Sequence, residues 1–306
     1  MKRLSALLLA TVTVAAAGCS AGTGSAGPAA ADASNEAAIR VVASTDVYGD
    51  IVQVVGGTAV SVTSVIDNPD KDPHEYEADA QTQLALSKAQ LVVENGGGYD
   101  DFVATMLAAR SSNPTLVDVT ELSGYDTEPA EGEFNEHLWY DLPTVVKLTD
   151  RLSSDLAALA PDQAATFTAN AAAFTDRLTA LQQDAAKIKK DHQGEGVAIT
   201  EPVPLYLLEA AGLSNKTPDE FSEAIEEGTD VPPAVLAQTL SLFDGRQVEL
   251  LAANEQTGGP QTEAVVAAAD KNAIPVVGFT ETLPAGETYL SWMQKNLDAV
   301  SEALDD

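Results

Sequence analysis

The sequence FTANAAAFTDRLTALQQDAAKI, residues 167–188, decides the arrangement of this 306-residue chain. Its apolar residues recur at alternating steps of four and three, which is the spacing of one face of an α-helix. Asp162 follows Pro161 at the front of the segment, lysines crowd its last turn and Gly194 comes just after it, so start, dipole and stop signals agree. The pattern predicts one helix over 161–192, roughly 45 Å long at 1.5 Å per residue. The apolar stripe consists of Phe167, Ala171, Phe174, Leu178, Leu181, Ala185 and Ile188.

Strand and helix patterns alternate on both sides of this helix, which predicts α/β layering with mostly parallel sheets. We expect two lobes, residues 37–160 and 193–306, each with a mostly parallel sheet flanked by helices. The long rigid helix would join them, because its stripe of two Phe and two Ala suits packing along two lobes better than the alternative, a coiled-coil seam. The predicted strands are 39–44, 60–66, 91–94, 115–119, 196–200, 249–253 and 274–279.

The N-terminal segment carries the signals of an exported lipoprotein. Lys2 and Arg3 precede an apolar run that is too short to span a membrane, and small residues then lead to Cys19, the only cysteine. This pattern is similar to the bacterial lipobox and predicts a signal peptide over 1–18 with lipidation of Cys19. Ordinary signal-peptidase cleavage beside an incidental cysteine is the alternative. Residues 19–36 have the composition of a flexible tether, so we expect an extracytoplasmic protein anchored to the outer face of the cell membrane.

The charge of the chain narrows its possible partners. The formal net charge is −31 at pH 7. Such a surface repels nucleic acid and anionic lipid headgroups, whereas it concentrates small cations. We therefore expect no nucleic-acid partner, and cations are the ligands that the charge favours.

Two of the three histidines lie among carboxylates in loops that follow predicted strands. His74 belongs to the sequence DPHEYE (72–77) and His137 to NEHLWYD (135–141). The carboxyl ends of parallel strands are where open α/β sheets bind ligands, and imidazole with carboxylates is a set that binds divalent transition metals. His74 and His137 are therefore candidate ligands in one cleft. His192 is explained by its place at the end of the long helix, and Trp139 by a place in the core.

These two motifs resemble those of the first lobe in the zinc/manganese solute-binding lipoproteins of ABC importers. The resemblance covers essentially the whole mature chain and implies a two-lobed fold with a metal ion held between the lobes. It also implies two second-lobe ligands, which fall on Glu201 and Glu281. Both residues end predicted second-lobe strands, so the fold supports the same placement independently. The chain departs from the family pattern at Glu136 and Leu142, where prolines are usual.

The resemblance implies a carrier and not an enzyme: it would bind one divalent transition metal ion as cargo and deliver it, as a monomer, to the membrane permease and cytoplasmic ATPase of an ABC importer. Two imidazoles and two carboxylates suit Mn²⁺ or Fe²⁺ if the carboxylates are bidentate, and tetrahedral Zn²⁺ if all four ligands are monodentate. The segment from Glu128 to Glu136 is acidic where many zinc-type members have a His-rich loop, and this difference favours Mn²⁺ slightly over Zn²⁺. The alternatives are a surface-anchored metallohydrolase, an adhesin or structural lipoprotein, and a binder of metal chelates.

Overall fold

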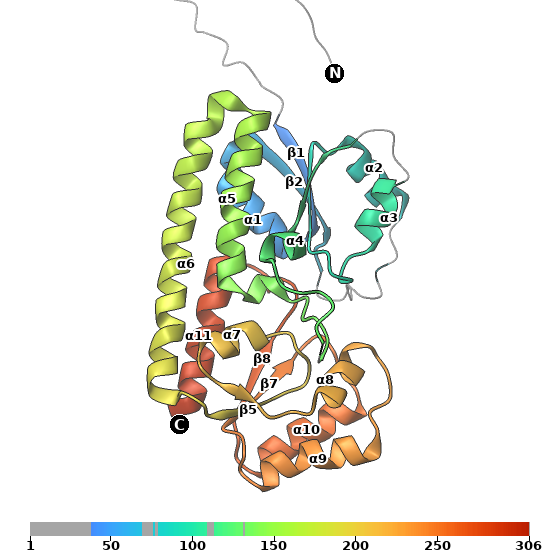
Figure 1. Cartoon of the computed structure of the whole chain (residues 1–306), viewed down its shortest axis with the longest axis vertical. Helices are drawn as coiled ribbons and strands as arrows, with labels where there is room; N and C mark the ends of the chain where they lie inside the picture. Colours follow the sequence, from blue (N-terminus) through green and yellow to red (C-terminus); the bar gives the residue numbers. More distant parts are fainter. Residues whose placement is uncertain (1–37, 69–75, 77–78, 109–112, 131, 306) are drawn as a thin grey trace, which may run out of the picture. The chain divides into compact units, whose positions relative to one another are not determined.

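Two parallel sheets with the same strand order form the framework of the protein (Figure 1). The structure is a computed structural model that describes residues 38–68, 76, 79–108, 113–130 and 132–305. The predicted signal peptide, the predicted lipidation site Cys19, the predicted tether and His74 lie outside the described residues. Among the residues that are described, no helix is both long enough and apolar enough to cross a membrane.

The first sheet has the strand order β2-β1-β3-β4, and every neighbouring pair is parallel. Helices connect the strands, as the alternating pattern predicts. Helix α5 follows the last strand of this sheet and begins where Asp141 accepts a hydrogen bond from the backbone N–H of Thr144. The elements are β1 (Ile39–Thr45), α1 (Asp46–Gly56), η1 (Gly57–Ala59), β2 (Val60–Ile66), α2 (Ala80–Lys88), β3 (Leu91–Glu94), α3 (Phe102–Ala108), β4 (Thr115–Asp118), α4 (Val119–Ser123), η2 (Leu138–Tyr140) and α5 (Leu142–Leu159).

The second sheet repeats this plan with the order β6-β5-β7-β8, again all parallel. Strand β6 has only two residues, which is too short for a recognisable apolar pattern and explains why the sequence does not predict it. The elements are β5 (Gly196–Ile199), α7 (Leu205–Ala210), β6 (Ser214–Asn215), α8 (Asp219–Glu226), α9 (Pro233–Asp244), β7 (Leu250–Asn254), α10 (Pro260–Lys271), β8 (Val276–Phe279) and α11 (Tyr289–Asp305).

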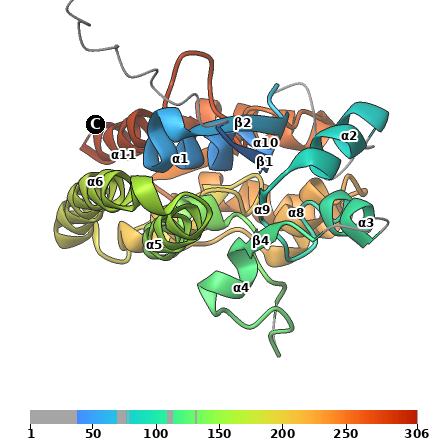
Figure 2. The same ribbon diagram turned by 90° about the horizontal axis from the view of Figure 1, so that it is seen from above.

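The long helix is present as α6 (Ala164–His192), preceded by a 3₁₀ turn at Pro161–Gln163. All seven residues of its predicted stripe are buried. They share one apolar core with residues of both sheets, and α6 contacts α1, α5, α7 and α11. Figure 2 shows α1, α5 and α11 beside it. Gly194 has a φ of +85°, a conformation that favours glycine and ends the helix as predicted. The prediction of two lobes, each with a parallel sheet flanked by helices, and of one long helix that joins them is therefore confirmed.

A buried carboxyl lies at the end of β3. Glu94 is 6% exposed, and burial together with the nearby carboxylates of Asp100 and Asp118 raises its pKa to about 8. In an unfolded chain a glutamate loses its proton near pH 4.3. The folded protein therefore binds a proton that the unfolded chain releases across this interval, and its stability falls as pH rises from about 4.5 to about 8.

We predict that Glu94→Gln stabilises the protein at pH 8.5 by more than about 1 kcal/mol and has little effect at pH 4.5, because the amide keeps the shape and removes the charge. Urea unfolding at the two pH values measures this. Glu302→Gln, at an exposed glutamate of α11, is the control and should change neither value. Equal effects of Glu94→Gln at both pH values would contradict the explanation.

Candidate metal centre

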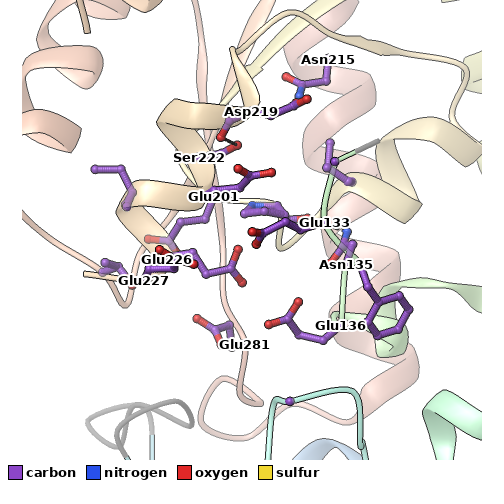
Figure 3. A pocket seen from close by; sticks show the side chains of 18 of the residues that line it. Glu133, Asn135, Glu136, Glu201, Asn215, Asp219, Ser222, Glu226, Glu227 and Glu281 are labelled. Atoms are coloured by element: carbon purple, nitrogen blue, oxygen red, sulfur yellow. Dashed lines mark hydrogen bonds between the residues drawn. The ribbon is translucent and has the colours of Figure 1, made fainter. Parts of the chain in front are cut away.

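An acidic cavity of about 540 Å³ lies at the carboxyl ends of the second-sheet strands, against the loop that carries His137 (Figure 3). Of the described residues that line it, eight are acidic and none is lysine or arginine. The carboxylates come from both lobes and surround one space. The acidic residues are Glu133, Glu136, Glu201, Asp219, Glu223, Glu226, Glu227 and Glu281.

His137 is fully buried beside this cavity, immediately before η2. The side-chain oxygen of Asn135 accepts a hydrogen bond from the backbone N–H of His137 at 3.1 Å and lies 2.8 Å from its Nδ1. Because that oxygen accepts, Nδ1 carries a proton, and the lone pair of a neutral ring is on Nε2. Nε2 lies 3.3 Å from Oε1 of Glu226 and 3.9 Å from Oε2 of Glu281. A cation placed among this nitrogen lone pair and the two carboxylate oxygens would be attracted by all three atoms.

Aromatic residues fix the orientation of this ring. The ring centroids of Tyr99 and Trp139 lie 6.0 Å and 5.2 Å from that of His137, both in edge-to-face arrangements. Both aromatic residues are buried, so Trp139 belongs to the core as expected and also packs against the ligand candidate. A donor held by packing in this way loses little freedom when it binds an ion.

The two predicted second-lobe ligands meet at Asn254, the last residue of β7. Glu201 follows β5 and Glu281 follows β8, and both are buried. The amide nitrogen of Asn254 donates to Oε2 of Glu201 and, at 2.9 Å, to Oε1 of Glu281. The hydroxyl of Tyr99, from the first lobe, donates to Oε2 of Glu281 at 3.1 Å. Asn254 thereby holds the two carboxylates together, and Tyr99 links Glu281 to the first lobe.

The loop that carries His137 is attached to both lobes. Asn95, just after β3, donates from its side chain to the backbone oxygen of Glu136 at 3.0 Å. The side chain of Asn135 donates to the carbonyl of Pro202 at 3.1 Å, and Tyr206 donates to the carbonyl of Asn135 at 2.8 Å. These bonds fix the position of His137 relative to the segment that contains Glu201.

The structure thus brings together three of the four residues predicted from sequence as ligands: His137, Glu201 and Glu281. His74 is not among the described residues, and the structure does not place it. Sequence reasoning missed Glu226, the last residue of α8, one acid among several in that segment. The sequence carries no signal for it, because the burial of Ser222, one turn earlier on the same face of α8, is visible only in the structure.

Charge crowding in the cavity changes the protonation of its outer carboxylates. Burial and the surrounding carboxylates, Glu136 foremost, raise the pKa of Glu226 to about 10. Burial, with Glu133 adding to it, raises the pKa of Glu136 to about 7. Donor atoms of Glu136, His137 and Glu226 lie within 4.8 Å of one another, a spacing that one metal ion could bridge. In the absence of a cation, protons have to relieve this repulsion.

This geometry defines a class of protein: a two-lobed α/β protein with a cation site beside the carboxyl ends of its parallel strands. The profile of the family described as zinc-uptake complex component A, periplasmic (ZnuA), matches residues 41–303, and the chain belongs to that family. The family consists of substrate-binding proteins of ABC transporters and not of enzymes, so the metallohydrolase alternative is not supported.

Individual relatives agree with this assignment. The chain is 26% identical over 278 residues to the manganese-binding lipoprotein MntA of Halalkalibacterium halodurans, covering 87% of this chain and 88% of MntA. It is 24% identical over 296 residues to the iron ABC transporter substrate-binding lipoprotein MtsA of Streptococcus pyogenes serotype M1, covering 87% and 89%. A crystal structure of ZnuA has the same fold, with a TM-score of 0.70, 22% identity and coverage of 87% and 97%.

We predict that Asn254→Leu weakens metal binding by at least about tenfold, because the two carboxylates lose the donor that orients them, and loss of such a partner of a metal ligand typically costs about 10–100-fold in affinity. Isothermal titration of the apo protein with Mn²⁺ measures the change. Asn215→Leu is the matched control, because Asn215 lines the same cavity but its side-chain oxygen accepts from the backbone N–H of Thr217. Equal affinities for wild type and Asn254→Leu would contradict the role of Asn254.

Proposed function

We propose that this protein captures one divalent transition metal ion between its lobes and delivers it to the permease of an ABC importer, which its cytoplasmic ATPase drives. The observation that carries the proposal is the buried Nε2 of His137 facing the carboxylates of Glu226 and Glu281 in a cavity whose described lining has no basic residue. Such a site binds a cation and repels anions. The relatives MntA and MtsA, named for manganese and iron, support a metal as the cargo.

We propose His74, His137, Glu201 and Glu281 as ligands, with Mn²⁺ as the preferred ion over Zn²⁺ and with Fe²⁺ also accommodated. Carboxylate oxygens can bind in bidentate fashion and raise the coordination number toward five or six, which suits Mn²⁺ and Fe²⁺ better than tetrahedral Zn²⁺. A site closed by protein ligands holds an ion and does not activate water, so transport fits better than catalysis.

We also propose how the protein is anchored to the membrane and where its lobes begin and end. We propose a signal peptide over 1–18, lipidation of Cys19 and a tether over 19–36, which would keep a monomeric binding protein at the outer face of the cell membrane. The proposed lobes are 37–160 and 193–306, joined by the helix over 161–192. The names of MntA and MtsA as lipoproteins support the anchored location.

A binder of metal chelates on the same fold has less support. Anionic chelates are usually held by arginine and aromatic side chains. The described lining of the cavity contains no arginine and one aromatic residue, Phe134. Its eight acidic residues would repel an anionic ligand.

We predict that the protein from residue 19 onward, with Cys19→Ser as its only change, binds one equivalent of Mn²⁺. Adding His137→Ala should lower the affinity by more than about 100-fold, because the ion loses a ligand atom. Metal analysis after dialysis and titration of the apo protein measure both. His192→Ala is the matched control, because His192 ends α6 and its Nδ1 lies 3.0 Å from a carboxylate oxygen of Glu195. Retention of one equivalent at wild-type affinity in His137→Ala would refute the proposed site.

A further inference from the structure

Helix α8 brings a carboxylate to the metal centre that neither motif anticipates. Glu226 is its last residue, 12% exposed in its side chain, and it comes from the second lobe. It lines the acidic cavity together with Glu201 and Glu281, and Figure 3 shows the three side chains around the same space. Its Oε1 lies closer to Nε2 of His137 than does Oε2 of Glu281, at 3.3 Å against 3.9 Å.

Nε2 of His137 and Oε1 of Glu226 are as far apart as two donor atoms that bind the same ion. Donors that bind one ion at about 2.1 Å, with angles of roughly 90–109° between them, lie about 3.0–3.4 Å apart. The 3.3 Å between Nε2 of His137 and Oε1 of Glu226 falls within this interval. An ion could therefore bind both atoms with little movement of either side chain.

We propose, on the basis of the metal-carrier function above, that Glu226 is a further ligand of the bound ion. Among the described residues it would join His137, Glu201 and Glu281 as a fourth protein donor and a third carboxylate. A third carboxylate adds an oxygen ligand, and bidentate binding can raise the coordination number above the four of tetrahedral Zn²⁺ toward the five or six of Mn²⁺ or Fe²⁺. Glu226 therefore gives the site its preference for the ion that accepts more oxygen ligands.

The opposing explanation is a structural ion pair between Glu226 and a protonated His137. In that case Glu226 would stabilise the protein without metal and would be displaced when metal binds. The two explanations differ in what removal of the charge does. A ligand role lowers metal affinity and removes one oxygen neighbour of the ion, whereas a structural role lowers the stability of the apo protein alone.

The test compares Glu226→Gln with Glu227→Gln. Glu227 is the adjacent glutamate, lines the same cavity and carries the same charge, so its substitution measures the general loss of negative charge. We expect Glu226→Gln to weaken Mn²⁺ binding by at least tenfold and to weaken Zn²⁺ binding less, while Glu227→Gln changes either by less than about threefold. X-ray absorption of the Mn²⁺-loaded Glu226→Leu variant, whose side chain has no oxygen, should show one oxygen neighbour fewer than wild type.

Equal Mn²⁺ affinities for Glu226→Gln and Glu227→Gln, with an unchanged oxygen count in Glu226→Leu, would overturn the ligand role of Glu226. The carrier function would survive that result if His137→Ala still abolished binding. Absence of metal binding by the wild-type protein would instead overturn both proposals. A lower melting temperature of the apo Glu226→Gln variant with unchanged metal affinity would identify the structural ion pair.

Discussion

The organising constraint of this protein is that several carboxylates are buried around the imidazole of His137, while the described residues that line their cavity include no lysine or arginine. Each buried charge costs free energy unless a partner compensates it. The fold compensates part of that cost with hydrogen-bond donors: Asn254 bridges Glu201 and Glu281, and Tyr99 donates to Glu281. Protonation of Glu226 relieves another part. A bound cation would relieve the remaining repulsion, so part of the cost of burying the carboxylates becomes affinity for the metal ion.

The scaffold meets this constraint with the same device in both lobes. In each sheet the strand order changes direction between the first and third strands, which is where α/β sheets bind ligands. An asparagine follows or ends the third strand in both cases. Asn95 holds the carbonyl of Glu136 and so positions His137, while Asn254 holds the two second-lobe carboxylates. Bonds across the lobes, such as that from Tyr140 to the carbonyl of Thr280 at 2.8 Å, favour local movement of the ligand segments over wide rotation of the lobes.

Long-period patterns were predictable from the sequence, and short-range geometry was not. The stripe on α6 extends over about six helical turns, and the seven residues predicted to be buried are the seven that the structure buries. Strand ends shifted by one or two residues, as at β8, and the two-residue β6 has no pattern to recognise. Within the site, His137 stands out because histidine is rare in this chain, whereas Glu201 and Glu281 required the family resemblance. Glu226 was missed because one acid among 47 carries no signal until the turn of α8 brings it to His137.

The central claim is that one metal ion binds at Nε2 of His137 between the second-lobe carboxylates. Anomalous diffraction from crystals grown with Mn²⁺ tests it most directly. The account predicts a single strong peak about 2.0–2.3 Å from that nitrogen, with carboxylate oxygens of Glu201, Glu226 and Glu281 among the other ligands of the ion. A peak at another place, for instance beside His192, or no peak at saturating Mn²⁺, would contradict the account.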